Sequence, residues 1–420
     1  MENEPQGHGE PHEVSLPADV EQAPHHLGGG YLYRPRQLLT GPRDLERVRG
    51  ELRRLGLAQW AEERLEAGGF VRLLLDAEEP TVPEIVQLIR GREFDLELGE
   101  RPVGVHPNHV LFGGTHPLPF PATSPRGAGP LGALSSQMSE QPGAGVRVAV
   151  FDSGLMEGHP WLGPRARTLR PNPQADTEAP VLRANNQLAH YAGHGTFVAG
   201  VVLQHAPGAE VVARKVFGGD GVCDDAALAG ALAELPPEVQ VANLSLGAYT
   251  HGDQEPPLTA AALTECFRRN PHLVVVAAAG NDGLDRRTYP AAFKRVLGVG
   301  ALGPDGRRAC FSNFGTWVDA WAPGVDVHST FFDADFDPEP GPGPHCLGQP
   351  ASGTQQFRLW ASWSGTSFAA PRVAGAIAAL AGTGMDAPEA AFRLVGAPAA
   401  PRLQERGCGL GAVVNPASYG

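Results

Sequence analysis

The sequence predicts an α/β fold, a doubly wound and mostly parallel sheet with helices on both faces, preceded by a small α+β unit. Continuous apolar runs recur from residue 146 onward. Such runs are typical of strands that are buried on both faces of a parallel sheet. Helical stretches separate these runs, and strands alternating with helices favour a right-handed, doubly wound arrangement. A shorter alternation comes before residue 115, so we expect two structured parts of unequal size.

The part before residue 146 divides into three segments. Residues 1–29 are acidic and polar, and we expect them to form a disordered tail. Apolar residues at strand and helix spacing then predict a small α+β domain over 30–114. Its expected strands are 31–39, 70–76 and 109–114, and its expected helices are 42–57 and 81–91. Residues 115–145 are rich in Pro, Gly and Ser, which is typical of a linker.

The larger part, residues 146–420, contains the continuous apolar runs. We expect its strands at 146–152, 209–217, 239–247, 272–281 and 296–302, and its helices at 194–204, 224–235, 259–269 and from Ser367 onward. Residues 331–361 form an insertion just before this last helix. A solvated surface hairpin and a role in substrate choice are equally open for it. In doubly wound folds, chemistry gathers at the carboxyl ends of the strands.

Composition and charge exclude several classes of function. The net charge of −13 argues against a nucleic-acid-binding protein, which normally has a basic surface. No apolar run approaches the roughly 20 residues of a membrane helix, so we expect no membrane partner. The first residues lack the basic and apolar segments of a signal peptide. This favours a cytoplasmic location, with secretion still open if the gene begins upstream. Five scattered cysteines, an odd number, do not suggest a disulfide scaffold.

Four polar residues stand at the ends of predicted strands or at the starts of predicted helices. Asp152 ends the first apolar run, and Asn281 ends the fourth. His194 begins the helix in "GHGTFVAGVV", and Ser367 begins the helix in "WSGTSFAAPRVAG". Taken singly, each residue has an ordinary explanation as a cap or a turn residue. Together they place Asp, His and Ser in the chain order of the subtilisin triad, with an Asn between His and Ser.

The surrounding motifs resemble those of the subtilisin-like serine proteases, the S8 family or subtilases. The resembling segments are "VAVFDSGLMEGHPWL", "GHGTFVAGVV", "NLSLG", "VVVAAAGND", "FSNFGTWVDAWAPGVDVHST" and "WSGTSFAAPRVAG". The resemblance extends over about 146–420, and the high Ala, Gly and Pro content suggests a bacterial source. It implies a subtilisin-like fold and a serine endopeptidase that cleaves peptide or protein substrates through an acyl-enzyme.

The resemblance also implies a role for each site residue. Ser367 would be the nucleophile, His194 the general base, and Asp152 the group that orients the imidazole. Asn281 would contribute to the oxyanion hole together with the backbone amide of Ser367. The substrate-binding residues would be Ser245, Leu246 and Gly247 on one side, and Ala278, Ala279, Gly280 and Asp282 on the other. The chemistry requires no cofactor. We expect no metal at the catalytic site, and a structural calcium ion stays open.

Two features depart from the pattern or extend it. Many relatives have a second His where this chain has Phe197, which we expect to pack in the core. Subtilases are commonly made with an N-terminal propeptide, so residues 30–114 are expected to act as one, with a permanently attached adaptor domain as the alternative. We expect its end to lie beside Ser245–Gly247 and self-cleavage to occur between Gly113 and Gly145, with Arg126 as a first guess.

Two other functions compete with a protease. A subtilisin-fold binding protein that no longer cleaves is the main alternative, but all triad positions and Asn281 are present. An esterase of the α/β-hydrolase kind needs Gly-x-Ser-x-Gly with the acid and the His after the Ser. Here Ala369 occupies the second Gly position and both partners precede Ser367. The sequence therefore favours the protease.

Overall fold

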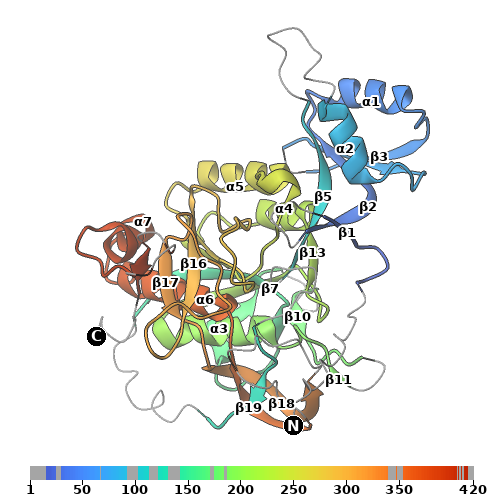
Figure 1. The fold of residues 1–420 in the computed structure, drawn as a ribbon. Helices are drawn as coiled ribbons and strands as arrows, with labels where there is room; N and C mark the ends of the chain where they lie inside the picture. The colour runs from blue at the N-terminus through green and yellow to red at the C-terminus, as the bar shows by residue number, and fades with distance from the viewer. Residues whose placement is uncertain are drawn as a thin grey trace, which may run out of the picture.

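The computed structural model describes residues 16–24, 30–66, 68–91, 103–112, 122–130, 142–170, 175–183, 187–338, 347, 353–403, 405, 408 and 411–414. A small unit from the N-terminal residues, in blue, lies beside a larger part coloured green to red (Figure 1). Several predicted segments lie outside the described residues: 1–15 and 25–29 of the expected tail, and 115–121 and 131–141 of the expected linker.

Eight described strands of the larger part form a parallel sheet, in the order β20-β17-β16-β15-β14-β7-β12-β9. These strands are β7 (Arg147–Asp152), β9 (Ala166–Thr168), β12 (Glu210–Lys215), β14 (Val241–Leu244), β15 (Val274–Ala278), β16 (Val296–Leu302), β17 (Ala320–Pro323) and β20 (Ala412–Val413). The five expected strands are all present, and the prediction of a parallel α/β sheet is confirmed. Sequence analysis missed β9, β17 and β20, which are too short to give a clear apolar run.

Helices cover both faces of this sheet (Figure 1). They are α3 (His194–His205) and α6 (Thr366–Ala381) on one face, with α7 (Ala387–Ala391) beside α6, and α4 (Asp225–Ala233) and α5 (Pro257–Arg269) on the other. Both α3 and α6 are buried along almost their whole length. Such all-round burial is typical of helices in the centre of a large core.

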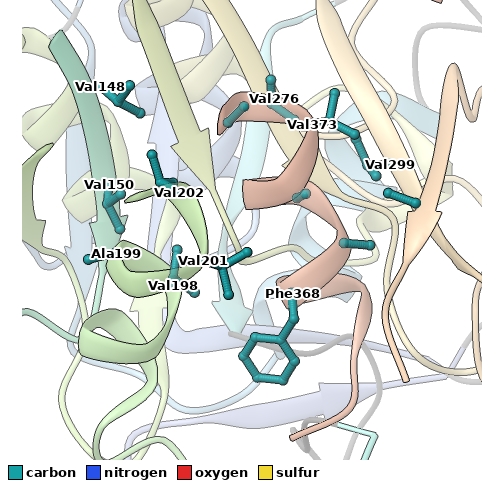
Figure 2. Packing of buried hydrophobic residues seen from close by; sticks show 14 of the residues in the cluster. Val148, Val150, Val198, Ala199, Val201, Val202, Val276, Val299, Phe368 and Val373 are labelled. Atoms are coloured by element: carbon teal, nitrogen blue, oxygen red, sulfur yellow. The ribbon is translucent and has the colours of Figure 1, made fainter. Parts of the chain in front are cut away.

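The central strand β7 shows why its sequence is continuously apolar. Val148 and Val150 belong to the core cluster that contains α3 and α6, whereas Ala149 and Phe151 belong to the cluster that contains α4 and α5. Successive side chains of a strand point to opposite faces, so both faces of β7 require apolar residues. Figure 2 shows the first cluster, in which the valines of β7 lie near those of α3.

The N-terminal unit has an antiparallel sheet covered by two helices. Its elements are β1 (Glu21–Ala23), β2 (Tyr31–Thr40), α1 (Leu45–Arg54), β3 (Trp60–Arg64), β4 (Val71–Leu75), α2 (Val82–Gly91) and β5 (Val105–Phe112). The apolar stripes of the two helices, including Val48, Leu52 and Ile85, are buried against the sheet. The sheet runs in the order β13-β5-β2-β4-β3, with β1 beside β2. Its outermost strand, β13 (Val222–Asp224), belongs to the larger part.

The prediction of a disordered tail is wrong for residues 16–24. Residues Glu21–Ala23 form β1, which pairs with β2 in antiparallel register. Val20 is 5% exposed and belongs to a small cluster with Leu32 and Phe112. These isolated apolar residues find burial only in the tertiary structure, so the polar composition around them was misleading.

The prediction of a simple linker is also wrong for residues 122–130. Arg126–Gly127 form β6, which pairs with β19 (Gln355–Trp363). Ala122 is buried in the main core. The backbone of Thr123 accepts a hydrogen bond from Trp363 Nε1 at 2.5 Å. This stretch is therefore fastened to the larger part.

The insertion at 331–361 is part of a longer hairpin. β18 (Val327–Pro338) pairs with β19, and β11 (Gln187–Leu188) pairs with the far end of β18. A solvated hairpin is wrong for its inner half, because Phe331 and Phe357 are fully buried. The outer half does face solvent, as Asp333 and Asp335 show. Its role in substrate choice stays a prediction.

The cysteines differ from the expectation in one respect. Cys310 is disulfide-bonded, whereas Cys223, Cys266 and Cys408 are buried free thiols. The cytoplasmic location stays a prediction.

Candidate active site

Asp152 and His194 form a buried pair. Asp152 ends the central strand β7, and His194 begins α3. The carboxylate Oδ1 of Asp152 lies 2.7 Å from Nδ1 of His194, and both side chains are 0% exposed. An imidazole that donates from Nδ1 to a carboxylate keeps Nε2 unprotonated, which is the form that a general base needs.

The glycines on either side of His194 are required by close contacts. A Cβ added to Gly195 would lie 2.2 Å from the carbonyl oxygen of Gly154, and one added to Gly193 would lie 2.2 Å from the ring of Phe331. Gly193 also has a φ of 86°, in the left-handed region that favours glycine. The "GHG" sequence thus lets α3 begin directly against the turn that follows Asp152.

Ser367 lies in the first turn of α6 and has no exposed surface. Pro371 follows four residues later and has no N–H, so the carbonyl of Ser367 has no donor from within the helix. The hydroxyl of Ser245 takes that place and donates to the Ser367 carbonyl at 2.8 Å. Asn243 in turn donates from Nδ2 to the Ser245 hydroxyl at 2.9 Å. The apparent irregularity at Pro371 thus anchors the nucleophile's helix to the segment after β14.

Packing brings the start of α6 to the start of α3. The ring of Phe368, the residue after Ser367, lies 5.2 Å from the imidazole of His194 between centroids. Trp363 lies 5.4 Å from the same imidazole. Phe197 is fully buried and packs against Phe368, so the expectation that it packs in the core is confirmed. Nε2 of His194 makes no hydrogen bond to a described residue, so the Ser367–His194 bond of a working triad is not formed in this arrangement.

Asn281 is held against the same helix start. Its side-chain oxygen Oδ1 accepts from the backbone N–H and from the hydroxyl of Thr366, each at 2.9 Å. The Thr366 hydroxyl lies 3.0 Å from the backbone nitrogen of Gly280, which donates to it. With its oxygen fixed in this way, the side-chain amide of Asn281 is locked beside the residue that precedes Ser367.

The expected substrate-binding segment 245–247 is occupied by the N-terminal unit. Phe112, the last residue of β5, exchanges two backbone hydrogen bonds with Gly247, at 2.9 and 2.7 Å. On its other side, β5 pairs with β13. The end of β5 therefore lies between β13 and Gly247, as the sequence led us to expect for Ser245–Gly247. Leu246 is 1% exposed.

At and just after the end of β15 lie Ala278, Ala279, Gly280 and Asp282, which the sequence led us to expect on the opposite wall. The carbonyl of Ala279 accepts from the Thr288 hydroxyl at 2.7 Å and from Asn313 Nδ2 at 3.0 Å. The Asp282 carboxylate accepts from the Tyr249 hydroxyl at 2.8 Å. Burial and the negative charge of Asp282 raise the pKa of Tyr249, so this hydroxyl stays protonated.

Sequence reasoning missed several residues around the site. β13 was not expected, and only its last residue, Asp224, falls within an expected helix. Thr366 and Asn313 lie within the resembling segments but were given no role, and Glu178 lies outside those segments. Glu178 is a buried carboxylate that contacts the residues on both sides of His194. Nothing in its local sequence, "ADTEA", gives a reason to expect this.

Within the described ranges, there is no group of three or more His, Cys, Asp or Glu side chains that could hold a metal ion. No helix in the same ranges has the length and apolar character needed to cross a membrane.

The chain is similar in sequence and in fold to known proteins. The model of the subtilase family (Peptidase S8) matches residues 143–388. Subtilisin BL and subtilisin Savinase, both of Lederbergia lenta, are each 34% identical over 248 residues, which cover 56% of this chain and 76% of each relative. The crystal structure of fervidolysin from Fervidobacterium pennivorans, described as a keratinolytic enzyme related to subtilisin, is similar with a TM-score of 0.60 at 20% identity.

That structural similarity covers 92% of this chain and 61% of the other, so it extends beyond the part matched by the family model. At this identity it supports the fold alone. The family match covers more than half of the chain, and the two subtilisins support it independently. The chain therefore belongs to the subtilase family of serine endopeptidases.

Proposed function

We propose that the larger part hydrolyses peptide bonds through Asp152, His194 and Ser367. The observation that carries this proposal is the buried 2.7 Å contact between Asp152 and His194, with Ser367 beginning the helix that packs against that imidazole. A serine hydroxyl is a weak nucleophile until an adjacent base removes its proton. The sequence order, the family and the packing all agree with this assignment.

The reaction follows from the positions of these groups. His194 Nε2 takes the hydroxyl proton as Ser367 Oγ attacks the carbonyl carbon, and the C–N bond breaks as the proton passes to the leaving amine. Water then attacks the resulting ester by the same route and releases the second product. Asp152 keeps the proton on Nδ1 and stabilises the imidazolium. The chemistry needs no cofactor.

Asn281 is the proposed side-chain donor to the tetrahedral oxyanion. Its Oδ1 is fixed by Thr366, which leaves the Nδ2 group as the part that can face the reacting carbonyl. The backbone amide of Ser367 is the proposed second donor, since the N-terminus of a helix favours negative charge. Removing one such donor typically lowers kcat by roughly 10²- to 10³-fold.

The substrate would bind as an added strand beside Ser245, Leu246 and Gly247. The backbone of Gly247 already pairs in this way with Phe112, so the edge accepts an extended chain. Ala278, Ala279 and Gly280 would line the other side of the first specificity pocket, with Asp282 near its rim. Because Asp282 accepts a hydrogen bond from Tyr249, it is partly engaged within the protein.

The N-terminal unit would act as an autoinhibitory propeptide. Two observations support this role: the end of β5 fills the strand position beside Gly247, and Ser367 is fully buried. A substrate cannot reach Ser367 until this arrangement changes. We expect one cut between Gly113 and Gly145. Arg126 is a poor cleavage site, because it lies in β6 and its backbone is paired with Ser362 of β19.

A fluorophosphonate probe tests the nucleophile. Wild-type protein should be labelled, and Ser367→Ala should not be labelled and should lose roughly 10⁶-fold in kcat. No labelling of correctly folded and processed wild-type protein would favour the alternative, a subtilisin-fold binding protein that does not cleave.

Intact mass tests the propeptide. Wild-type protein should lose its N-terminal residues during purification, whereas Ser367→Ala should keep its full length. A wild-type chain that is fully active at full length would identify the N-terminal unit as a permanent adaptor.

A further inference from the structure

Glu178 lies between the turn that follows Asp152 and the first turn of α3, next to the buried Asp152–His194 pair. Residues Thr177–Glu178 form β10, which pairs in parallel with β8 (Leu155–Met156), just after the turn that follows Asp152. On its other side, Glu178 faces the first turn of α3. It is only 5% exposed. A carboxylate in such a position must be satisfied by hydrogen bonds.

Four hydrogen bonds reach this carboxylate, and in all four Glu178 accepts. The hydroxyl of Ser153 donates to Oε1 at 2.6 Å, and the backbone N–H of Gly193 donates to the same oxygen at 2.7 Å. Thr196 donates to Oε2 from its hydroxyl at 2.8 Å and from its backbone at 3.3 Å. An ionised carboxylate is an acceptor only, so these four donors favour the charged form of Glu178 and oppose the effect of burial.

Ser153 extends this network to both members of the pair. Its hydroxyl, while donating to Glu178, accepts from the backbone N–H of Gly195 at 2.7 Å. Its own backbone N–H donates to Asp152 Oδ1 at 2.7 Å, the same oxygen that contacts His194. The amides on both sides of His194 are thus bound to Glu178 directly or through Ser153.

We propose that Glu178 is a positioning residue for the catalytic imidazole: it ties the turn after Asp152 to the first turn of α3 and so fixes the Asp152–His194 geometry. This inference rests on the proposed function. Glu178 does not touch the substrate and takes part in no bond change. It acts through the backbone on either side of His194, and through the negative charge it places there.

The charge has a second effect. His194 sits at the N-terminus of α3, where the helix dipole disfavours a positive imidazolium. The charged group that acts on the Glu178 carboxylate is Asp152, on β7, whereas Ser153, Gly193 and Thr196 are neutral. On its own strand side, the preceding Asp176 is paired with Arg214. A negative Glu178 therefore offsets part of the positive end of the α3 dipole, where His194 lies.

Burial raises the pKa of Glu178 to about 7, and the neighbouring Asp152 adds to that rise. Its folded pKa is raised, so Glu178 becomes charged only as the pH rises toward neutrality. Above this pKa, replacing Glu178 by Gln removes one negative charge from the network around the first turn of α3.

The test measures the pH dependence of kcat and of kcat/KM for processed wild-type enzyme and Glu178→Gln. We expect kcat to fall about tenfold at pH 8, with KM within twofold. The acid limb of the kcat/KM profile should move to lower pH, because imidazolium loses a stabilising charge.

Asp225→Asn is the matched control. Asp225 is also fully buried, has a pKa raised by burial to about 6, and accepts from Leu258 and Thr259 at the start of another helix, α5. This variant should lose stability but keep the acid limb of the wild-type profile. A purely structural role for Glu178 predicts the same behaviour for both variants.

Ser153→Ala provides a second variant that removes the hydroxyl without removing the carboxylate. It should lower kcat several-fold, and combining it with Glu178→Gln should cost less than the sum of both, because the two side chains form one unit. If Glu178→Gln does not fold, Ser153→Ala carries the test.

The inference would be overturned if Glu178→Gln or Ser153→Ala kept the wild-type kcat and the wild-type acid limb of the kcat/KM profile. It would also be overturned if Asp225→Asn moved the acid limb as far as Glu178→Gln does. These outcomes leave the proposed function standing, since active and labelled wild-type enzyme is the reference in each. An inactive, unlabelled wild-type protein would instead contradict the proposed function itself.

Discussion

The first turns of α3 and α6 both carry a proposed catalytic residue, yet their surroundings differ in charge. The first turn of α3 is contacted by two carboxylates, Asp152 on the side chain of His194 and Glu178 on the backbone. The first turn of α6 is contacted by the neutral amide of Asn281, through Thr366. Both helices are buried and begin with glycine at the N-cap.

The reaction explains this difference. Positive charge develops on His194, at a helix end whose dipole opposes it, so carboxylates are needed there. Negative charge develops beside Ser367, at a helix end whose dipole favours it, so a neutral donor suffices. The same secondary-structure feature therefore needs opposite partners at the two positions.

Neutralising Asp152, the carboxylate on the imidazole of His194, should have the largest effect on kcat among changes to the groups that contact these two helix starts. Asp152→Asn keeps the shape of the side chain but permits the wrong imidazole tautomer, and we expect kcat to fall about 10⁴-fold. Steady-state kinetics with a peptide substrate measures this. A loss below tenfold would mean that His194 does not depend on Asp152 for its orientation.

Replacing Asn281 at the start of α6 should have the next largest effect on kcat. Asn281→Ala should lower kcat by roughly 10²- to 10³-fold with little change in KM. Asn281→Asp should be at least about tenfold worse than Asn281→Ala at pH 8, because a second negative charge would face the oxyanion.

The difference between these two Asn281 variants separates charge from the loss of a donor. Equal activities would show that charge at the start of α6 is unimportant. If Asn281→Ala raised KM alone, Asn281 would not be a donor to the oxyanion.

Removing the hydrogen bond from Ser245 to the carbonyl of Ser367 at the start of α6 should have a smaller effect on kcat. Ser245→Ala removes the donor to the Ser367 carbonyl, and we expect a roughly tenfold lower kcat, in line with about 1–2 kcal/mol for an unsatisfied buried acceptor. Pro371→Ala restores an N–H four residues after Ser367. Adding it to Ser245→Ala should recover part of the activity. A double variant no better than Ser245→Ala would show that this carbonyl is not the cause.

Most of the main sheet could be predicted because its strands are buried on both faces. Val148, Ala149 and Val150 must all be apolar, so the run stands out in the sequence. The positions of Asp152 and Asn281 at strand ends followed from the same logic. The short strand β13 has no such signal, since it exists through its pairing with β5 and ends at Asp224, the N-cap of α4.

Glu178 and Thr366 could not be predicted for a related reason. Their importance comes from contacts with residues distant in the chain, and a single Glu or Thr at the end of a short element has many ordinary explanations. The same holds for Val20, whose burial depends on Leu32 and Phe112. Local patterns reveal periodic burial, whereas isolated polar contacts appear only once the chain is folded.

The sheet shared by β13 and the strands of the N-terminal unit has a thermodynamic consequence. A substrate or inhibitor that adds a strand between β13 and Gly247 takes the place of β5, so the two binding events exclude each other. By linkage, any groove ligand lowers the stability of the β5-containing sheet by an amount that grows with the logarithm of its concentration over its dissociation constant. After a cut, the freed unit would inhibit only as far as its concentration exceeds its dissociation constant. Dilution alone would then switch the enzyme on.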